Sequence, residues 1–119
     1  MIDVEITQER LNELCQFDAP TISNAIESFN IREKYEGFMD YKIKSIFSNQ
    51  KPIIGYASTA MISTAKRQTD TQKENFYKYL ETLNRKPKPS IAVIQDIDPK
   101  PLGSFWGEVN ASIHFSLGC

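Results

Sequence analysis

The stretch from Ser90 to Cys119 constrains this chain most, because it is patterned as a strand, a loop and a helix in that order. The run Ile91 to Ile94 follows a proline, is rich in β-branched residues and is typical of a buried strand. An apolar stripe then predicts a helix that begins near Ser104 and packs on a sheet: Phe105, Val109, Ile113 and Leu117. A strand that leads into a helix favours an α/β sheet, whose ligand sites lie at such junctions.

Helical periodicity predicts further helices before this unit. The first runs from Thr7 to Phe17. The second begins at Thr21, the expected cap, and carries an apolar face made by Ile22, Ala25, Ile26 and Phe29. The third begins at a capping box formed by Thr71 and Glu74 and ends at Asn84.

Two more strands are predicted in the middle of the chain. Residues 42–47 alternate in part and carry lysines, as an edge strand does, and Asn49-Gln50 then turns the chain. Residues 53–62 form a longer strand, in which Gly55 marks a bulge or a close backbone approach. The expected order is α-α-β-β-α-β-α. We therefore expect one α/β domain over residues 1–119, with a mixed sheet flanked by helices.

Composition excludes several functional classes. The net charge of −1 gives no electrostatic case for direct binding of nucleic acid or an anionic membrane. No apolar run is long enough to cross a membrane, and the acidic amino end lacks the pattern of a signal peptide. Cys15 and Cys119 lie far apart in the sequence and outside any CxxC motif. We therefore expect no structural disulfide, and a reducing cytoplasm fits this pattern.

Three carboxylates near the last helix are candidates for metal chemistry. Asp96 and Asp98 leave the strand together, and Glu108 lies in the first helical turn. Such a set could hold a hard divalent cation with waters completing its shell. The alternative is that Asp96 and Asp98 are turn formers while Glu108 complements the helix dipole.

The backbone from Gly107 to Asn110 is the second candidate feature of this junction. Its amides belong to the first turns of the predicted helix, where they lack helical partners and can bind a carboxylate or phosphate. A pyruvate-like substrate has such a carboxylate. His114 is the only histidine and is interpreted as a packed or surface residue, and Trp106 as a packing or subunit-contact residue.

Several stretches together resemble the RraA-like family, which includes regulators of ribonuclease activity and 4-hydroxy-4-methyl-2-oxoglutarate aldolases. The helix from Thr21 to Ile26 is similar to the family's opening T-x-x-S-D-A-L/I helix, with Asn24 where Asp is usual. The segment Ile54 to Thr59 resembles V/I-G-x-A-x-T. The strand Ile91 to Asp96, with Trp106 to Ala111 after it, resembles V-L/I-V-x-D followed by G-E/D-L-x-A.

The resemblance implies a swivelling β/β/α fold that is usually trimeric. In the aldolases a divalent cation, commonly Mg²⁺, holds pyruvate as its enolate, so that the same site decarboxylates oxaloacetate. By this resemblance Glu108 is the catalytic acid that orients metal-bound water. Gly107, Val109 and Asn110 are the substrate-binding residues, with the Val109 and Asn110 amides on the substrate carboxylate.

The family's G-x-x-R-D motif does not occur in the sequence. Its Arg binds substrate and its Asp binds the metal, and both are expected on a strand beyond Cys119. We therefore expect the chain to be the amino-terminal portion of an RraA-like domain, with no metal ligand of its own and no activity alone. Two functions remain open: a metal-dependent lyase acting on 2-oxo acids in the full-length protein, and a non-catalytic regulator that binds a protein such as ribonuclease E.

Overall fold

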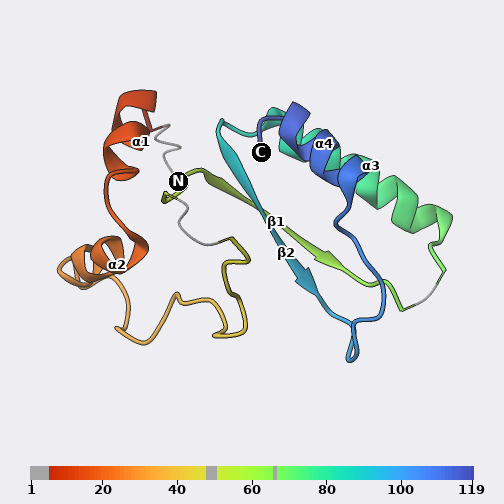
Figure 1. Cartoon of the computed structure of the whole chain (residues 1–119), viewed down its shortest axis with the longest axis horizontal. Helices are drawn as coiled ribbons and strands as arrows, with labels where there is room; N and C mark the ends of the chain where they lie inside the picture. The colour runs from red at the N-terminus through yellow and green to blue at the C-terminus, as the bar shows by residue number, and fades with distance from the viewer. Residues whose placement is uncertain (1–5, 48–50, 66) are drawn as a thin grey trace. The chain divides into compact units, whose positions relative to one another are not determined.

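Two parallel strands organise the carboxyl-terminal half of the chain in a computed structural model that describes residues 6–47, 51–65 and 67–119. Strand β1 (Tyr56–Ile62) pairs with β2 (Ser90–Asp96), with Tyr56 opposite Ser90 and Ile62 opposite Asp96. Parallel neighbours need a crossover connection, which α3 (Asp70–Arg85) supplies. Helix α4 (Glu108–Ser116) follows β2 (Figure 1).

The chain divides into two compact units, Met1–Ile53 and Ile54–Cys119. The first holds α1 (Gln8–Leu14) and α2 (Ala19–Glu27), and the second holds both strands with α3 and α4. The order of the described elements is therefore α-α-β-α-β-α, in the α/β class. No helix in the described part of the chain is long and apolar enough to cross a membrane.

The predicted strand at 42–47 is wrong. The segment forms turns and bends, in which the Lys42 amide donates to the Asp40 carboxylate at 2.9 Å and the Ser45 hydroxyl donates to the Phe47 carbonyl at 2.7 Å. Such local bonds offer the backbone an alternative to a ladder. Across the described ranges the sheet is therefore two parallel strands rather than the expected mixed sheet. The turn expected at Asn49-Gln50 and the acidic amino end at 1–5 lie outside the described residues.

The predicted strand at 53–62 forms over its second part, as β1. The close backbone approach expected at Gly55 is confirmed, because a Cβ there would lie 2.8 Å from the Pro89 carbonyl oxygen. Glycine is therefore required where the chain enters the sheet beside the start of β2.

Helix caps differ from the predicted ones in two helices. Asp18, expected to end the first helix, caps α2 by accepting the Thr21 amide at 2.8 Å, with Pro20 in the first turn. The capping box of α3 is formed by Thr69 and Gln72 rather than by the pair two residues later. In both cases the residue that caps the helix has extended backbone, as a cap requires.

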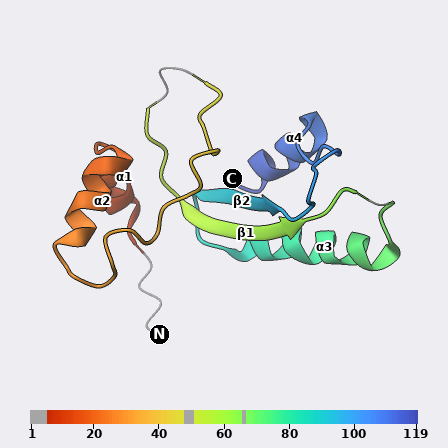
Figure 2. The same ribbon diagram turned by 90° about the horizontal axis from the view of Figure 1, so that it is seen from below.

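One face of β1 is covered. Ser58 is 1% exposed, and Ala60 and Ile62 on the same face are half-buried. The residues that alternate with them are exposed: Ala57, Thr59 and Met61. Leu83 of α3 is fully buried at 0% exposure. Figure 2 shows α3 running along the two strands, so this helix supplies the apolar cover that a parallel sheet needs.

The outer edge of β1 is blocked by a lysine. The Tyr56 amide donates to Pro89 and the Ile62 carbonyl accepts from Ile97, so backbone groups of even-numbered β1 residues face β2. Ala57 therefore faces the other way, and its carbonyl accepts the Lys86 ammonium at 2.8 Å. Lysines commonly protect sheet edges against unwanted pairing.

The Asp98 carboxylate ties together the segments that follow the two strands. It accepts the Ser63 hydroxyl at 2.5 Å, the Thr64 amide at 2.6 Å and the Ala65 amide at 2.8 Å. These hydrogen bonds, with the Ser63 hydroxyl first, hold the pKa of the Asp98 carboxyl below its ordinary value of 3.8. The ionised form is favoured in the folded state.

Replacing Asp98 by Asn should lower the midpoint of thermal unfolding at pH 7, because the amide cannot accept all of these bonds. A carboxyl with a lowered pKa stabilises the fold above pH 3.8 and loses this effect as the pH falls through its folded value. The difference between the two proteins should therefore shrink in acid. Melting curves at pH 7 and at a pH below 3.8 test this prediction. Glu74→Gln on α3 is the control, because it removes the same charge. Equal melting of wild type and Asp98→Asn at pH 7 would contradict the role of this carboxylate.

Candidate functional site

The amino-terminal turn of α4 has unpaired backbone donors. Gly107 is its cap, with extended backbone (φ −162°) and no side chain to accept a bond. The first helical bond runs from the Ala111 amide to the Gly107 carbonyl at 2.9 Å. The amides of Glu108, Val109 and Asn110 precede it and have no helical acceptor. This turn can therefore bind an anion.

The four residues predicted from the sequence lie together in this turn, because they are consecutive: Gly107, Glu108, Val109 and Asn110. The side chains of Glu108 and Val109 are exposed, and that of Asn110 is half-buried. The helix begins at Glu108 rather than near Ser104 as predicted. Glu108 thus lies at the positive end of the helix dipole, where a carboxylate is favourable.

Asp96 and Asp98 do not join Glu108 in a metal site. Asp98 is engaged by the residues after β1, and the Asp96 carboxylate accepts the Asp98 amide at 2.9 Å. This bond is an Asx turn, which supports the interpretation of these acids as turn formers. Among the residues that the structure describes, no three His, Cys, Asp or Glu side chains are grouped to hold a metal ion.

His114 joins α4 to α3 beneath this turn. Its side chain is packed, with the residue only 3% exposed. Its Nδ1 lies 2.7 Å from the Asn110 carbonyl oxygen, and its Nε2 lies 2.9 Å from the Tyr79 hydroxyl. A carbonyl oxygen only accepts, so Nδ1 carries a proton. In the neutral ring Nε2 then accepts the proton of Tyr79.

The Tyr79 hydroxyl continues this network to the sheet. It also forms a hydrogen bond with Ser58 of β1. Burial, with a smaller contribution from the charge of Cys119, raises the pKa of Tyr79 above its ordinary value of 10.0, and the bond with Ser58 opposes the shift. The protonated phenol is therefore favoured, as a donor to His114 must be.

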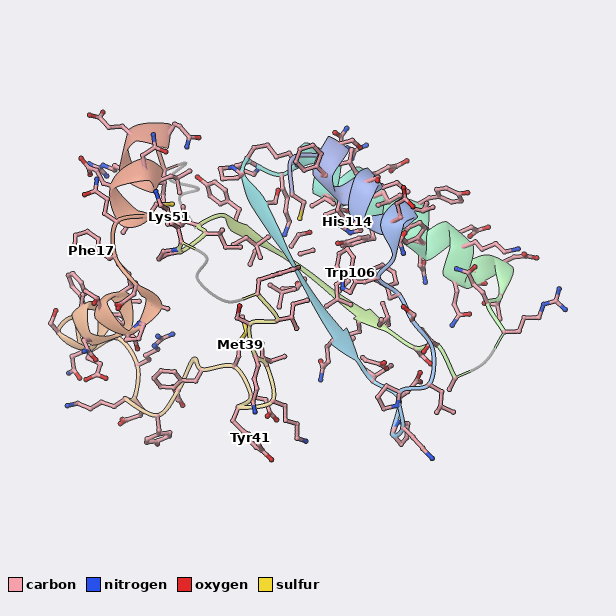
Figure 3. All side chains as sticks on the ribbon, viewed as in Figure 1. Phe17, Met39, Tyr41, Lys51, Trp106 and His114 are labelled. Carbon is pink, nitrogen blue, oxygen red and sulfur yellow. The ribbon has the colours of Figure 1, made fainter. Side chains whose placement is uncertain are left out.

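Aromatic rings surround His114 where the chain enters α4. The centroid of Trp106 lies 4.8 Å and that of Phe105 6.3 Å from the imidazole centroid, both edge-on. Figure 3 shows Trp106 beside His114. The Asn110 side chain donates to the Phe105 carbonyl at 2.5 Å. These contacts fix the backbone before α4 and the direction in which its free amides point.

The apolar stripe predicted for α4 is wrong at one position, Val109, whereas Phe105, Ile113 and Leu117 are half-buried. Val109, expected to face the sheet, is 73% exposed, and Asn110 and His114 take the inner positions with the half-buried Ile113 and Leu117. Asn110 and His114 are four residues apart and lie on one helical face. A polar histidine can be buried there because both ring nitrogens are paired.

A hollow of about 740 Å³ lies at the carboxyl end of β1. Three segments form it: the end of β1 and the residues after it, the first half of α3, and the segment from Ser104 to Asn110. Sequence analysis did not identify it. The spacing of Gln72, Phe76 and Tyr79 on one face of α3 is the available signal, but it also fits ordinary core packing.

The chain has no match among protein-family models, curated proteins or solved structures. The likeness to the RraA-like family therefore depends on the sequence stretches described above, chiefly the strand from Ile91 and the turn at Gly107.

Tyr79→Phe should destabilise the protein by about 1–3 kcal/mol, because it leaves the buried His114 Nε2 without its donor. Tyr77→Phe is the matched control, since Tyr77 lies on the same helix and is 65% exposed. Urea unfolding measures both. The phenol of the unfolded chain ionises as the pH rises above 10.0. The difference in unfolding free energy between wild type and Tyr79→Phe should therefore decrease above this pH. Equal stability of the two variants at pH 7 would show that the Tyr79 bond contributes little.

Proposed function

We propose that the chain carries the substrate-carboxylate turn of an RraA-like lyase with a swivelling β/β/α fold. The full-length protein would cleave 2-oxo acids of the 4-hydroxy-4-methyl-2-oxoglutarate type to pyruvate and decarboxylate oxaloacetate. The observation that carries this proposal is the uncapped turn of α4, in which Gly107 leaves three successive amides free at the positive end of a helix.

A carboxylate suits this turn for geometric reasons. Its two oxygens can accept from the amides of Val109 and Asn110 at once, and the helix dipole adds a favourable charge interaction. Glycine at the cap brings no side chain over the amides. The Asn110 amide belongs to the residue whose carbonyl accepts from His114, so the turn is held in place before substrate arrives.

A metal ion fits the described residues only in part. In the turn of α4, Glu108 is the single carboxylate, whereas Mg²⁺ bound by protein usually has one or two carboxylates together with substrate groups and water. These residues alone do not hold the ion. The role proposed for Glu108 is to accept a hydrogen bond from a water molecule near the bound acid. The other ligands are proposed to lie outside this chain.

Assembly and location follow from the same proposal. An RraA-like protein would act as a trimer in the cytoplasm, with its site near a subunit interface. Two observations support this: Cys15 and Cys119 are unpaired thiols, and the loop after α2 exposes large apolar side chains that a partner subunit could cover. Figure 3 labels Met39 and Tyr41 in this loop, which are 66% and 82% exposed.

The second candidate is a non-catalytic regulator that binds a protein such as a ribonuclease. The same exposed residues favour it, because large apolar side chains on a surface mark interaction sites: Phe29, Ile31, Tyr35, Phe38, Met39 and Tyr41. The two candidates differ in whether the turn of α4 binds a small acid.

Val109→Pro should abolish binding of pyruvate or its analogue oxalate, because proline removes one of the carboxylate-binding amides. The helix should persist, since Pro20 occupies the same position in the first turn of α2. Amide chemical shifts during a titration measure binding. Val109→Ala is the control, as it shortens an exposed side chain and keeps the amide. If Val109→Pro binds oxalate as well as Val109→Ala does, the turn is not the carboxylate site.

The 119-residue chain should not accelerate oxaloacetate decarboxylation beyond the rate with free Mg²⁺. The reason is that Glu108 lacks further metal ligands in its turn. Pyruvate release with and without the protein measures this. Mg²⁺-dependent release that exceeds the background and is lost in Glu108→Ala would mean that the chain is a complete enzyme.

A further inference from the structure

The hollow at the end of β1 has the size and position of a ligand site. Its volume of about 740 Å³ lies within the range of roughly 300–1,000 Å³ usual for small-molecule pockets. It lies where β1 ends, between Ala60 and Thr64, and the carboxyl ends of parallel strands are where α/β folds bind ligands. Of the first turn of α4, Asn110 lines the hollow, whereas Glu108 and Val109 do not.

The wall formed by α3 has an apolar centre and a polar rim. Gln72, Phe76 and Tyr79 follow one another along the helix at intervals of three to four residues, so they lie on one face. Lys73 lies on one flank of this row and Asn75 on the other, which follows from the helical turn of about 100° per residue. A ligand in the hollow would therefore lie on rings and meet polar groups at its edge.

Aromatic rings from two segments form the inner surface. Phe76 and Phe105 meet edge to face with centroids 6.2 Å apart, and Phe76 and Tyr79 are stacked at 6.5 Å. Such rings favour another flat ring, which can stack or pack edge-on against them. The bond from the Asn110 side chain to the Phe105 carbonyl holds the backbone that carries this ring.

The charges around the hollow favour an anion. Among the described residues that line the hollow, Lys73 is the one cation and none is acidic. The lysine forms an ion pair at 3.0 Å with Asp70, whose side chain is 95% exposed, so this pair is weak and leaves donors free. Gln72 and Lys73 of the lining belong to the first turn of α3, where the helix dipole is positive. The Asp98 carboxylate is engaged by Ser63 and Thr64, two residues of the lining.

We propose that this hollow binds a small aromatic carboxylate, with the ring against Phe76 and Phe105 and the carboxylate beside Lys73. The site adjoins the turn of α4, because Asn110 belongs to that turn and also lines the hollow. The two sites differ in their donors, since the turn is proposed to bind a carboxylate with backbone amides and offers no ring. The inference does not depend on the lyase function, since it uses none of the turn's free donors.

The test is a titration of the full chain with 2-naphthoate and with neutral 2-naphthol, followed by amide chemical shifts. Both should shift the signals of Phe76 and Phe105, and naphthoate should bind more tightly. Lys73→Gln should weaken naphthoate about threefold to tenfold and leave naphthol unchanged, because only the charged group meets the lysine. Lys78→Gln removes the same charge from α3 outside the lining and should change neither affinity.

Phe105→Leu keeps an apolar side chain but removes a ring, and should weaken both probes. Any of three results would overturn the proposal: shifts confined to other regions, equal effects of Lys73→Gln and Lys78→Gln, or displacement of naphthoate by oxalate. The last result would place the naphthoate carboxylate on the turn of α4. If oxalate fails to bind anywhere while naphthoate behaves as expected, the lyase proposal fails and this one stands.

Discussion

The parallel ladder between β1 and β2 is the constraint on which the second unit depends. Two parallel strands cannot be joined by a tight turn, so α3 must return the chain along the sheet. This return places Tyr79 over Ser58 and buries Leu83. The ends of both strands then lie at one edge, where Asp98 joins the segments that follow them.

The hydrogen bond between Tyr79 of α3 and His114 of α4 holds α4 against α3. Helix α4 is short, and its amino terminus has no side-chain cap, so intrinsic helix stability contributes little. Its position depends instead on a buried histidine that contacts α3 on one side and its own first turn, at Asn110, on the other. The turn of α4 and the adjoining hollow therefore both depend on the bonds of His114, although the two sites use different donors.

Local patterns predicted the elements that are amphipathic and specified by nearby residues. The strand from Ile91 and the helical turn at Glu108 are of this kind. The glycine pattern at Gly55 also predicted a close backbone approach, but not its partner, Pro89. Residues 42–47 also alternate, but a strand needs a partner edge, which no local pattern supplies. The burial of His114 likewise depends on Tyr79, which is 35 residues away in the chain. The hollow could not be predicted because it forms only where three separate segments meet.

The two edges of the sheet are chemically unequal. The Lys86 ammonium occupies the Ala57 carbonyl on the β1 side, whereas on the β2 side the Ser90 amide already donates to the Gly118 carbonyl at 3.0 Å. Because backbone groups alternate along a strand, those of Ala92 and Ile94 also point to this side and have no partner among the described residues. An added strand would therefore meet the Lys86 ammonium beside β1, whereas beside β2 it would meet the backbone groups of Ala92 and Ile94.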